Sequence, residues 1–163
     1  MEKGQKGLRK GLFRQVLGLL VILSLVAATS SFGALFPPGP WYQELTKPAL
    51  TPPGWVFTPV WLTLYLMIAL AGWLVWRKAP SPWHTAVVLW AAQLVLNAIW
   101  SWIFFGLQSP ELALVDICLL LLLILGFILY AYPLSRSASL LFLPYAAWVG
   151  LAAYLNLGIV WLN

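Results

Sequence analysis

The chain has 163 residues, of which 63% are hydrophobic and 8% are charged, and its mean hydropathy is +0.91. A soluble domain of this length carries about a quarter of its residues as charges. This composition therefore excludes a soluble globular protein and indicates a protein surrounded by lipid. Nine Lys and Arg residues against four acids give a formal charge of +5. The basic residues flank apolar runs and form no stripe elsewhere, which argues against a nucleic-acid partner.

Five apolar segments are each long enough for a membrane-spanning helix, which needs about 20 mostly apolar residues. We predict an all-α integral membrane protein, a bundle of five transmembrane helices, with spans over residues 11–36, 55–76, 83–105, 111–132 and 137–161. Residues 11–163 would form one domain behind a basic leader at residues 1–10. Pro59 and Pro144 fall inside spans, where we expect local kinks because proline lacks an N–H.

The first apolar segment has two interpretations. Its basic flank, its apolar run and the small residues at 27–31 are also typical of a cleaved signal peptide. The length of the run favours a full crossing instead.

The basic residues lie almost entirely on one side of this topology. Lys47 alone faces the other side, and the remaining eight are Lys3, Lys6, Arg9, Lys10, Arg14, Arg77, Lys78 and Arg136. The positive-inside rule then predicts a cytoplasmic amino terminus and a carboxy terminus on the opposite side. The rule predicts on which side of a membrane each terminus lies, and it does not identify the membrane.

The longest connection, residues 37–54, reads PPGPWYQELTKPALTPPG and contains six prolines. We expect it to be stiff and largely extended, with Trp41 and Tyr42 as an aromatic anchor. Two interpretations are open: an aromatic belt at the membrane surface, or a lid that caps a pocket in the bundle.

Polar and aromatic residues recur at helical spacing inside the spans. Gln93 and Asn97 share a helix face, which Trp100, Ser101 and Phe104 continue, and Trp61 and Tyr65 share another; the fifth span carries the stripe Tyr145, Trp148, Ala152 and Asn156. Buried amides commonly join helices by hydrogen bonds worth about 0.6–2 kcal/mol, which is our interpretation of Gln93. The other residues fall in the half of the bundle beneath the long connection. We therefore predict an aromatic-walled pocket for a large, flat, apolar ligand.

The remaining reactive side chains exclude several chemistries. Asp116 is the one acid well inside a span, where it either has a function or reaches the interface or an amide such as Asn97. The sole histidine, His84, starts the third span on the basic side, away from the predicted pocket. A histidine-bound metal, an axial histidine to haem and a Ser–His–Asp triad are therefore not expected, and no cofactor is required. Cys118, within an apolar run, is expected to be buried.

Three separated blocks carry a resemblance to a known family: WYQELTKPALTPPGWVFTPVWLTLY (41–65), QLVLNAIWSWIFF (93–105) and PYAAWVGLAAYLN (144–156). They resemble the tryptophan-rich sensory protein / translocator protein family (TspO/MBR, once the peripheral benzodiazepine receptor), and the similarity extends over nearly everything from Gly33 onward. The resemblance implies five helices around a capped pocket, and often a homodimer. It implies ligands such as protoporphyrin IX, haem in some members, sterols, and synthetic isoquinoline carboxamides or benzodiazepines. The family's pocket residues correspond to Tyr42, Trp61, Asn97, Trp148 and Ala152.

The resemblance leaves three functions open: a porphyrin-binding sensory protein that regulates tetrapyrrole or stress responses, a light-dependent protoporphyrin-degrading enzyme, or a transporter of porphyrins or lipids. Trp61 and Trp148 correspond to the tryptophans to which protoporphyrin degradation is assigned in bacterial members of the family. Two departures matter: Tyr154 is not followed within five residues by Lys or Arg, as the sterol motif requires, and the third span lacks Gly-x-x-x-Gly. The predicted ligand contacts are Tyr42, Trp61, Tyr65, Asn97, Trp100, Phe104, Trp148, Ala152 and Asn156, with Lys47 and Asp116 as candidate polar contacts.

Overall fold

The structure is a computed structural model that describes residues 2–163, with side chains described from Gly11 onward. The described residues form helices and no strand. Five segments are long and apolar enough to cross a membrane: Gly11–Ala34, Gly54–Lys78, Thr85–Gly106, Pro110–Ala131 and Arg136–Leu162. The predicted all-α fold with five spans is confirmed, and each end agrees with the prediction to within two residues.

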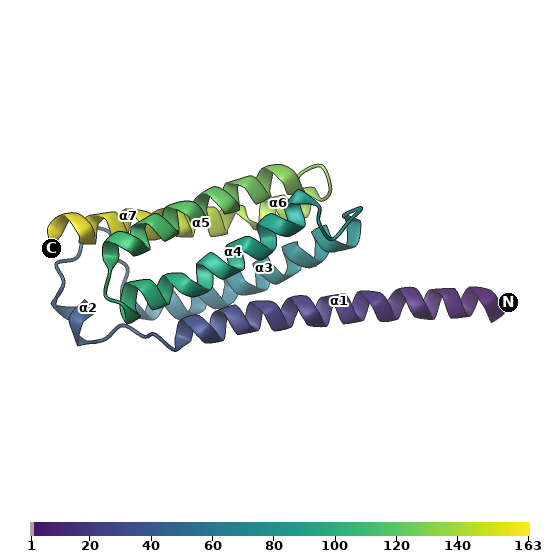
Figure 1. The fold of residues 1–163 in the computed structure, drawn as a ribbon, viewed down its shortest axis with the longest axis horizontal. Coiled ribbons are helices and arrows are strands. Elements are labelled where there is room, and N and C mark those ends of the chain that lie inside the picture. Colours follow the sequence, from purple (N-terminus) through teal and green to yellow (C-terminus); the bar gives the residue numbers. More distant parts are fainter. Residues whose placement is uncertain (1) are drawn as a thin grey trace.

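The elements in chain order are α1 (Glu2–Ala34), α2 (Pro40–Glu44), η1 (Gly54–Val56), α3 (Phe57–Lys78), α4 (Thr85–Ser101), η2 (Trp102–Gly106), α5 (Pro110–Ala131), α6 (Arg136–Leu141) and α7 (Leu143–Leu162). The two ends of the chain lie at opposite ends of the bundle (Figure 1). We call the end that holds residues 35–53 and the carboxy terminus the lid end, and the opposite end the basic end.

Helix α1 projects beyond the other helices at the basic end (Figure 1). Its 33 residues make it about 50 Å long, against about 33 Å for the 22 residues of α3, at 1.5 Å per residue. The described part of the predicted leader, residues 2–10, therefore joins the first span without a break in the helix. The side chains of its basic residues lie outside the described part of the chain.

Helix α1 is an integral member of the bundle, in contact with α3 and α4. Its buried residues Ile22, Val26 and Thr29 recur at steps of four and three, so they form one face. Most of its other large side chains from Leu12 to Leu25 are exposed, as expected for a lipid-facing surface. This packing favours the membrane span over the signal-peptide interpretation.

Close packing fills the basic half of the bundle. Gly72 of α3 lies against the indole of Trp90 on α4, where a Cβ on the glycine would overlap the ring. The Trp90 indole N–H donates to the Ile68 carbonyl at 2.9 Å. Phe127 and Phe142, both fully buried, join α5 to the fifth span with ring centroids 3.9 Å apart. Cys118, expected to be buried, instead lies exposed on the outer side of α5.

The two prolines inside spans behave differently. Pro144 is the second residue of α7, and the fifth span is interrupted at Phe142, just before it, which confirms a break there. The expected kink at Pro59 is wrong. Pro59 is the third residue of α3, in the first turn, where a missing N–H costs no helical hydrogen bond.

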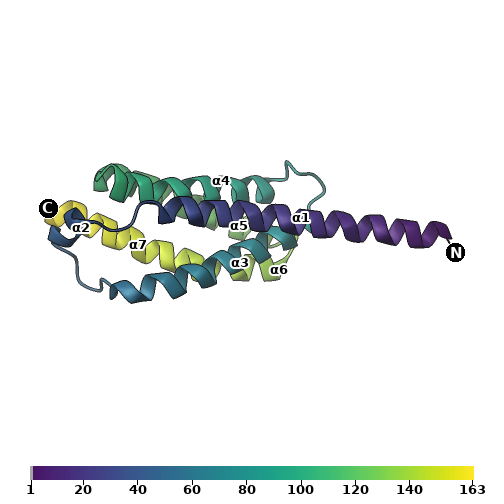
Figure 2. The same cartoon turned by 90° about the horizontal axis from the view of Figure 1, so that it is seen from below.

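Helices α3 and α7 diverge towards the lid end. They lie close together beside α6 and separate along their length, as the two perpendicular views agree (Figure 1 and Figure 2). In the basic half, α3 contacts α6, which belongs to the fifth span. The divergence opens space in the lid half, where the predicted pocket residues are concentrated.

Candidate functional site

A cavity of about 710 Å³ occupies the lid half of the bundle, walled by α1, α3, α4, α5 and α7 and roofed by the connection at residues 35–53. Its lining includes all nine predicted ligand contacts and Lys47, namely Tyr42, Lys47, Trp61, Tyr65, Asn97, Trp100, Phe104, Trp148, Ala152 and Asn156. Residues from four separate stretches of sequence thus meet around one space.

Aromatic rings from three spans line the side wall of the cavity. On α3, Trp61 stacks on Tyr65 with centroids 5.3 Å apart. On α4 and η2, Trp100 stacks on Phe104 at 4.9 Å. On α7, Trp148 meets the ring of Phe57 edge-on at 5.6 Å. These rings give a flat apolar ligand several faces on which to stack.

A chain of hydrogen bonds closes the floor of the cavity. The Tyr65 hydroxyl donates to Asn97 Oδ1, Asn97 Nδ2 donates to the Tyr145 hydroxyl, and Tyr145 donates to Gln93 Oε1, each at 2.9 Å. The chain ties α3, α4 and α7 together and fixes the orientation of the Asn97 amide. Gln93, fully buried, joins helices as the sequence predicted.

Asn156 also links helices at the cavity wall. Its Oδ1 accepts from the Trp100 indole N–H at 3.3 Å, and its Nδ2 donates to the Pro110 carbonyl at 2.8 Å. It therefore lines the cavity with an amide that already has protein partners. A ligand would therefore contact an amide whose oxygen and nitrogen already form hydrogen bonds within the protein.

A π-helical turn, η2, ends the third span. The Leu107 N–H reaches back to the Trp102 carbonyl at 2.8 Å, which inserts an extra residue into the turn. The turn sets Phe104 and Phe105 beneath the lid, where Tyr42 packs edge-on against Phe105 at 5.4 Å. Nothing in the residue pattern distinguishes a π turn from an α-helical one, so sequence reasoning missed it.

The connection at residues 35–53 is attached to the bundle as a lid. The Thr46 N–H donates to Asn163 Oδ1 at 2.9 Å, and Asn163 Nδ2 donates to the Thr46 carbonyl at 3.1 Å. Pro48 packs so closely on Gly158 of α7 that a Cβ there would lie 2.6 Å from the proline Cβ. The connection is less extended than expected, since it contains the short helix α2 and a left-handed residue, Leu50, with φ 68°.

Lys47 supplies the positive charge of the cavity. Its ammonium lies 4.7 Å from the Tyr42 ring centroid and donates to the carbonyls of Gln43 and Leu45, both at 3.2 Å. An ammonium has three N–H groups, so one remains for a ligand. Burial raises the pKa of the Tyr42 phenol above its usual value, so this ring stays neutral at physiological pH.

Asp116 does not belong to the cavity lining, although its neighbour Ile117 does. It is 6% exposed, so it does not reach the interface, and no described residue forms a hydrogen bond with its Oδ2. Asn97 is bonded to two tyrosines and is not its amide partner. Asp116 therefore lies outside the lining itself, and a polar contact between its carboxyl and a ligand stays a prediction.

His84 caps the start of α4 at the basic end, where its Nδ1 accepts from the Ala86 N–H at 3.2 Å. The described residues hold no group of three or more His, Cys, Asp or Glu side chains suited to a metal ion.

Sequence reasoning missed the contribution of α1. Ser30, Gly33 and Ala34 line the cavity, and Gly33 lies beside Ser101 of α4, so that a Cβ would be 3.4 Å from its hydroxyl. The signal was the run of small residues near the end of the first span, which fits close helix packing as well as a cleavage site. Phe57 and Phe105 were also missed, because aromatic residues near a span end are common in interfacial belts.

Comparisons with known proteins show which family the chain resembles. The family model described as the TspO/MBR family matches residues 18–162. The chain is 42% identical over 157 residues to the tryptophan-rich protein TspO of Chlorobaculum tepidum, covering 92% of this chain and 98% of the relative. It is 38% identical to the protein of the same name from Archaeoglobus fulgidus, covering 93% and 98%. It is 35% identical to the translocator protein of Sus scrofa, covering 85% and 84%. With the five spans and the matched length together, the chain belongs to the TspO/MBR family of integral membrane proteins.

Proposed function

We propose that this protein is a membrane-embedded binding and sensory protein for porphyrins, protoporphyrin IX or haem, that regulates tetrapyrrole or stress responses. The observation that carries the proposal is the cavity of about 710 Å³, because its size falls within the usual range of ligand sites and its lining includes the stacked pairs Trp61–Tyr65 and Trp100–Phe104. A macrocycle is the flat, apolar ligand that such walls would suit best.

The charge distribution supports one orientation of the ligand. The macrocycle would stack on Trp61 and Trp148, which come from the diverging helices α3 and α7. Its propionates would point to the lid, where Lys47 offers a cation with one unused N–H.

The test is a fluorescence titration of protoporphyrin IX into the protein in nanodiscs. We expect Trp61→Ala and Trp148→Ala each to weaken binding by about 5- to 30-fold, which corresponds to about 1–2 kcal/mol of lost stacking and contact area. Trp161→Ala is the matched control, since this tryptophan of α7 is 88% exposed and does not line the cavity. Wild-type affinity in both cavity variants would place the ligand elsewhere.

Light-dependent porphyrin degradation is the second candidate. Trp61 and Trp148 line the cavity. Among the described residues, neither of their indole N–H groups has a hydrogen-bond acceptor, unlike those of Trp90 and Trp100. An excited macrocycle beside an indole can accept an electron from it. If illuminated protoporphyrin bleaches equally fast with protein and with empty micelles, this candidate is wrong.

Orientation and assembly are further parts of the proposal. We place the basic end, with Arg14, Arg77 and Arg136, on the cytoplasmic side by the positive-inside rule. Membrane-impermeant labelling of Asn163→Cys in intact cells tests this, against the exposed Cys118→Ala background. A homodimer rests on the family resemblance alone, and crosslinking in native membranes tests it.

A further inference from the structure

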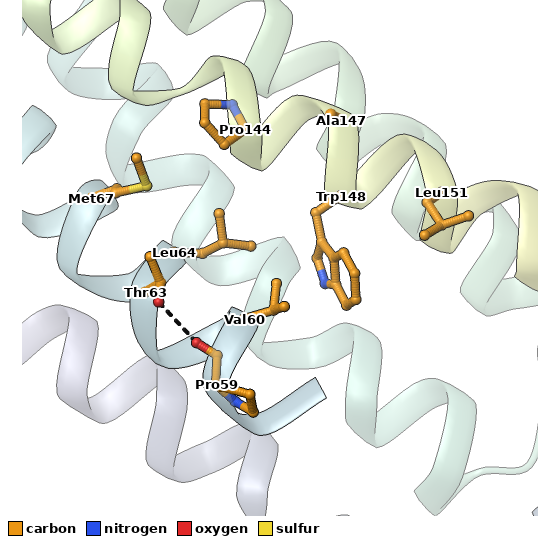
Figure 3. Close-up of a pocket in the computed structure, with 9 residues that line it drawn as sticks. All are labelled: Pro59, Val60, Thr63, Leu64, Met67, Pro144, Ala147, Trp148 and Leu151. Atoms are coloured by element: carbon orange, nitrogen blue, oxygen red, sulfur yellow. Dashed lines mark hydrogen bonds between the residues drawn. The ribbon is translucent and has the colours of Figure 1, made fainter. Parts of the chain in front are cut away.

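A second hollow of about 670 Å³ lies on the outer surface of the bundle, between α3 and α7. Its α3 wall includes Pro59, Thr63 and Met67, and its α7 wall includes Pro144, Ala147 and Leu151 (Figure 3). The Thr63 hydroxyl donates to the Pro59 carbonyl at 2.9 Å, so this polar group is already satisfied. The surface of this α3–α7 groove is thus apolar and suited to contact with acyl chains.

Among the residues whose side chains the structure describes, Trp148 alone lines both the groove and the internal cavity. Its indole projects from α7 across the gap towards α3, with Val60 opposite it (Figure 3). One side of this ring therefore borders the interior and another borders the groove. Trp148 acts as a partition between the lipid-facing surface and the cavity.

The Trp148 indole is held less firmly than the indoles of Trp90 and Trp100. Trp90 and Trp100 each donate a hydrogen bond from the indole N–H, to Ile68 O at 2.9 Å and to Asn156 Oδ1 at 3.3 Å. The described residues offer Trp148 no such acceptor, and an edge contact to the Phe57 ring at 5.6 Å is its aromatic restraint. A single rotamer change would join the two spaces.

The surroundings of Trp148 on α7 leave room for that movement. Ala147 and Ala152, its neighbours in sequence and one turn on along α7, carry the small side chain of alanine. The lid, by contrast, is tied to the carboxy-terminal end of α7 by the paired Thr46–Asn163 hydrogen bonds and by Pro48 on Gly158. The side of the bundle is thus the less constrained boundary of the cavity.

We propose that the ligand enters the cavity sideways from the bilayer, through the α3–α7 groove, with Trp148 as the movable partition. This inference rests on the proposed binding function and adds its route. The ligand class is a planar amphiphile that partitions into lipid. Its apolar edge would travel between Thr63 and Ala147, while its acidic groups stay at the lid end, towards which the groove opens at Pro59.

The experiment measures association and dissociation of protoporphyrin IX delivered from phosphatidylcholine vesicles to protein in nanodiscs. Ala147→Trp fills the groove from α7, and Thr63→Trp fills it from α3; both positions are exposed and lie outside the cavity lining. We expect both rate constants to fall by tenfold or more in each variant, with Kd unchanged, because a blocked passage slows entry and exit equally. Ala91→Trp, an exposed position on α4, is the matched control and should leave the rates unchanged.

Wild-type rates in the two groove variants would overturn the route, and so would slower association without equally slower dissociation. Asn163→Ala, which releases the lid, should leave the association rate unchanged; faster association would show entry past the lid instead. The equilibrium titration keeps the two ideas apart. If wild-type protein binds no porphyrin, the proposed function fails at that step, whereas normal affinity with unaltered rates in Ala147→Trp rejects the route alone.

Discussion

The two halves of the bundle use the same residue types for opposite purposes: side chains fill space in the basic half and border it in the lid half. In the basic half, Trp90 lies against Gly72 and donates its N–H to a backbone carbonyl, so the ring fills space. In the lid half, Trp61 and Trp148 stand on helices that diverge, and their rings border space. In this chain the Trp90 indole therefore closes a gap against a facing glycine, whereas the Trp61 and Trp148 indoles line a cavity.

Charges divide along the same axis. At the basic end, Arg77 lies 4.3 Å from the Trp73 ring and Arg136 lies 5.4 Å from the Tyr132 ring. At the lid end, Lys47 stands over Tyr42 and lines the cavity. Cations at the basic end thus cover aromatic rings at the bundle surface, whereas the cation at the lid end is available to an anionic ligand.

The largest effect on stability is expected in the basic half, where the packing is tightest. Gly72→Val places a branched side chain into the Trp90 ring and should destabilise the protein by about 3 kcal/mol or more. The measurement is the thermal unfolding midpoint in detergent. Gly150→Val, where a Cβ meets nothing within 4 Å, is the control and should cost less than about 1 kcal/mol. Equal losses would show that the two halves are packed alike.

An intermediate effect is expected at the floor that separates the halves. Tyr145→Phe removes the hydroxyl that accepts from Asn97 and donates to Gln93, and leaves two buried amides short of a partner. We expect a loss of about 1–2 kcal/mol, read as a lower unfolding midpoint. Tyr154→Phe is the control, because this tyrosine is exposed on α7. If Tyr145→Phe leaves the unfolding midpoint unchanged, packing alone holds the floor of the cavity.

The sequence predicted the spans and the convergence of the pocket residues because both follow from helical periodicity and depth. Asn97 and Trp61 could be placed in the lid half from span direction alone. Rotation about a helix axis is harder to predict in lipid, since an apolar residue satisfies either the core or the bilayer. Cys118 was misplaced for that reason, on a helix whose apolar residues are spread around its whole circumference.

The smallest effect is expected at the lid itself. Asn163→Ala removes the paired bonds to Thr46, both of which are exposed, so water can replace the lost partners at little cost in global stability. The unfolding midpoint should barely change, while the Thr46 amide should exchange with solvent about tenfold faster by hydrogen exchange. Gln43→Ala, an exposed substitution on the same connection, should leave that rate unaltered. If the Thr46 amide exchanges at its wild-type rate without Asn163, two packing contacts are sufficient to hold the lid: Pro48 on Gly158 and Tyr42 on Phe105. The lid half would then be more rigid than its hollow interior implies.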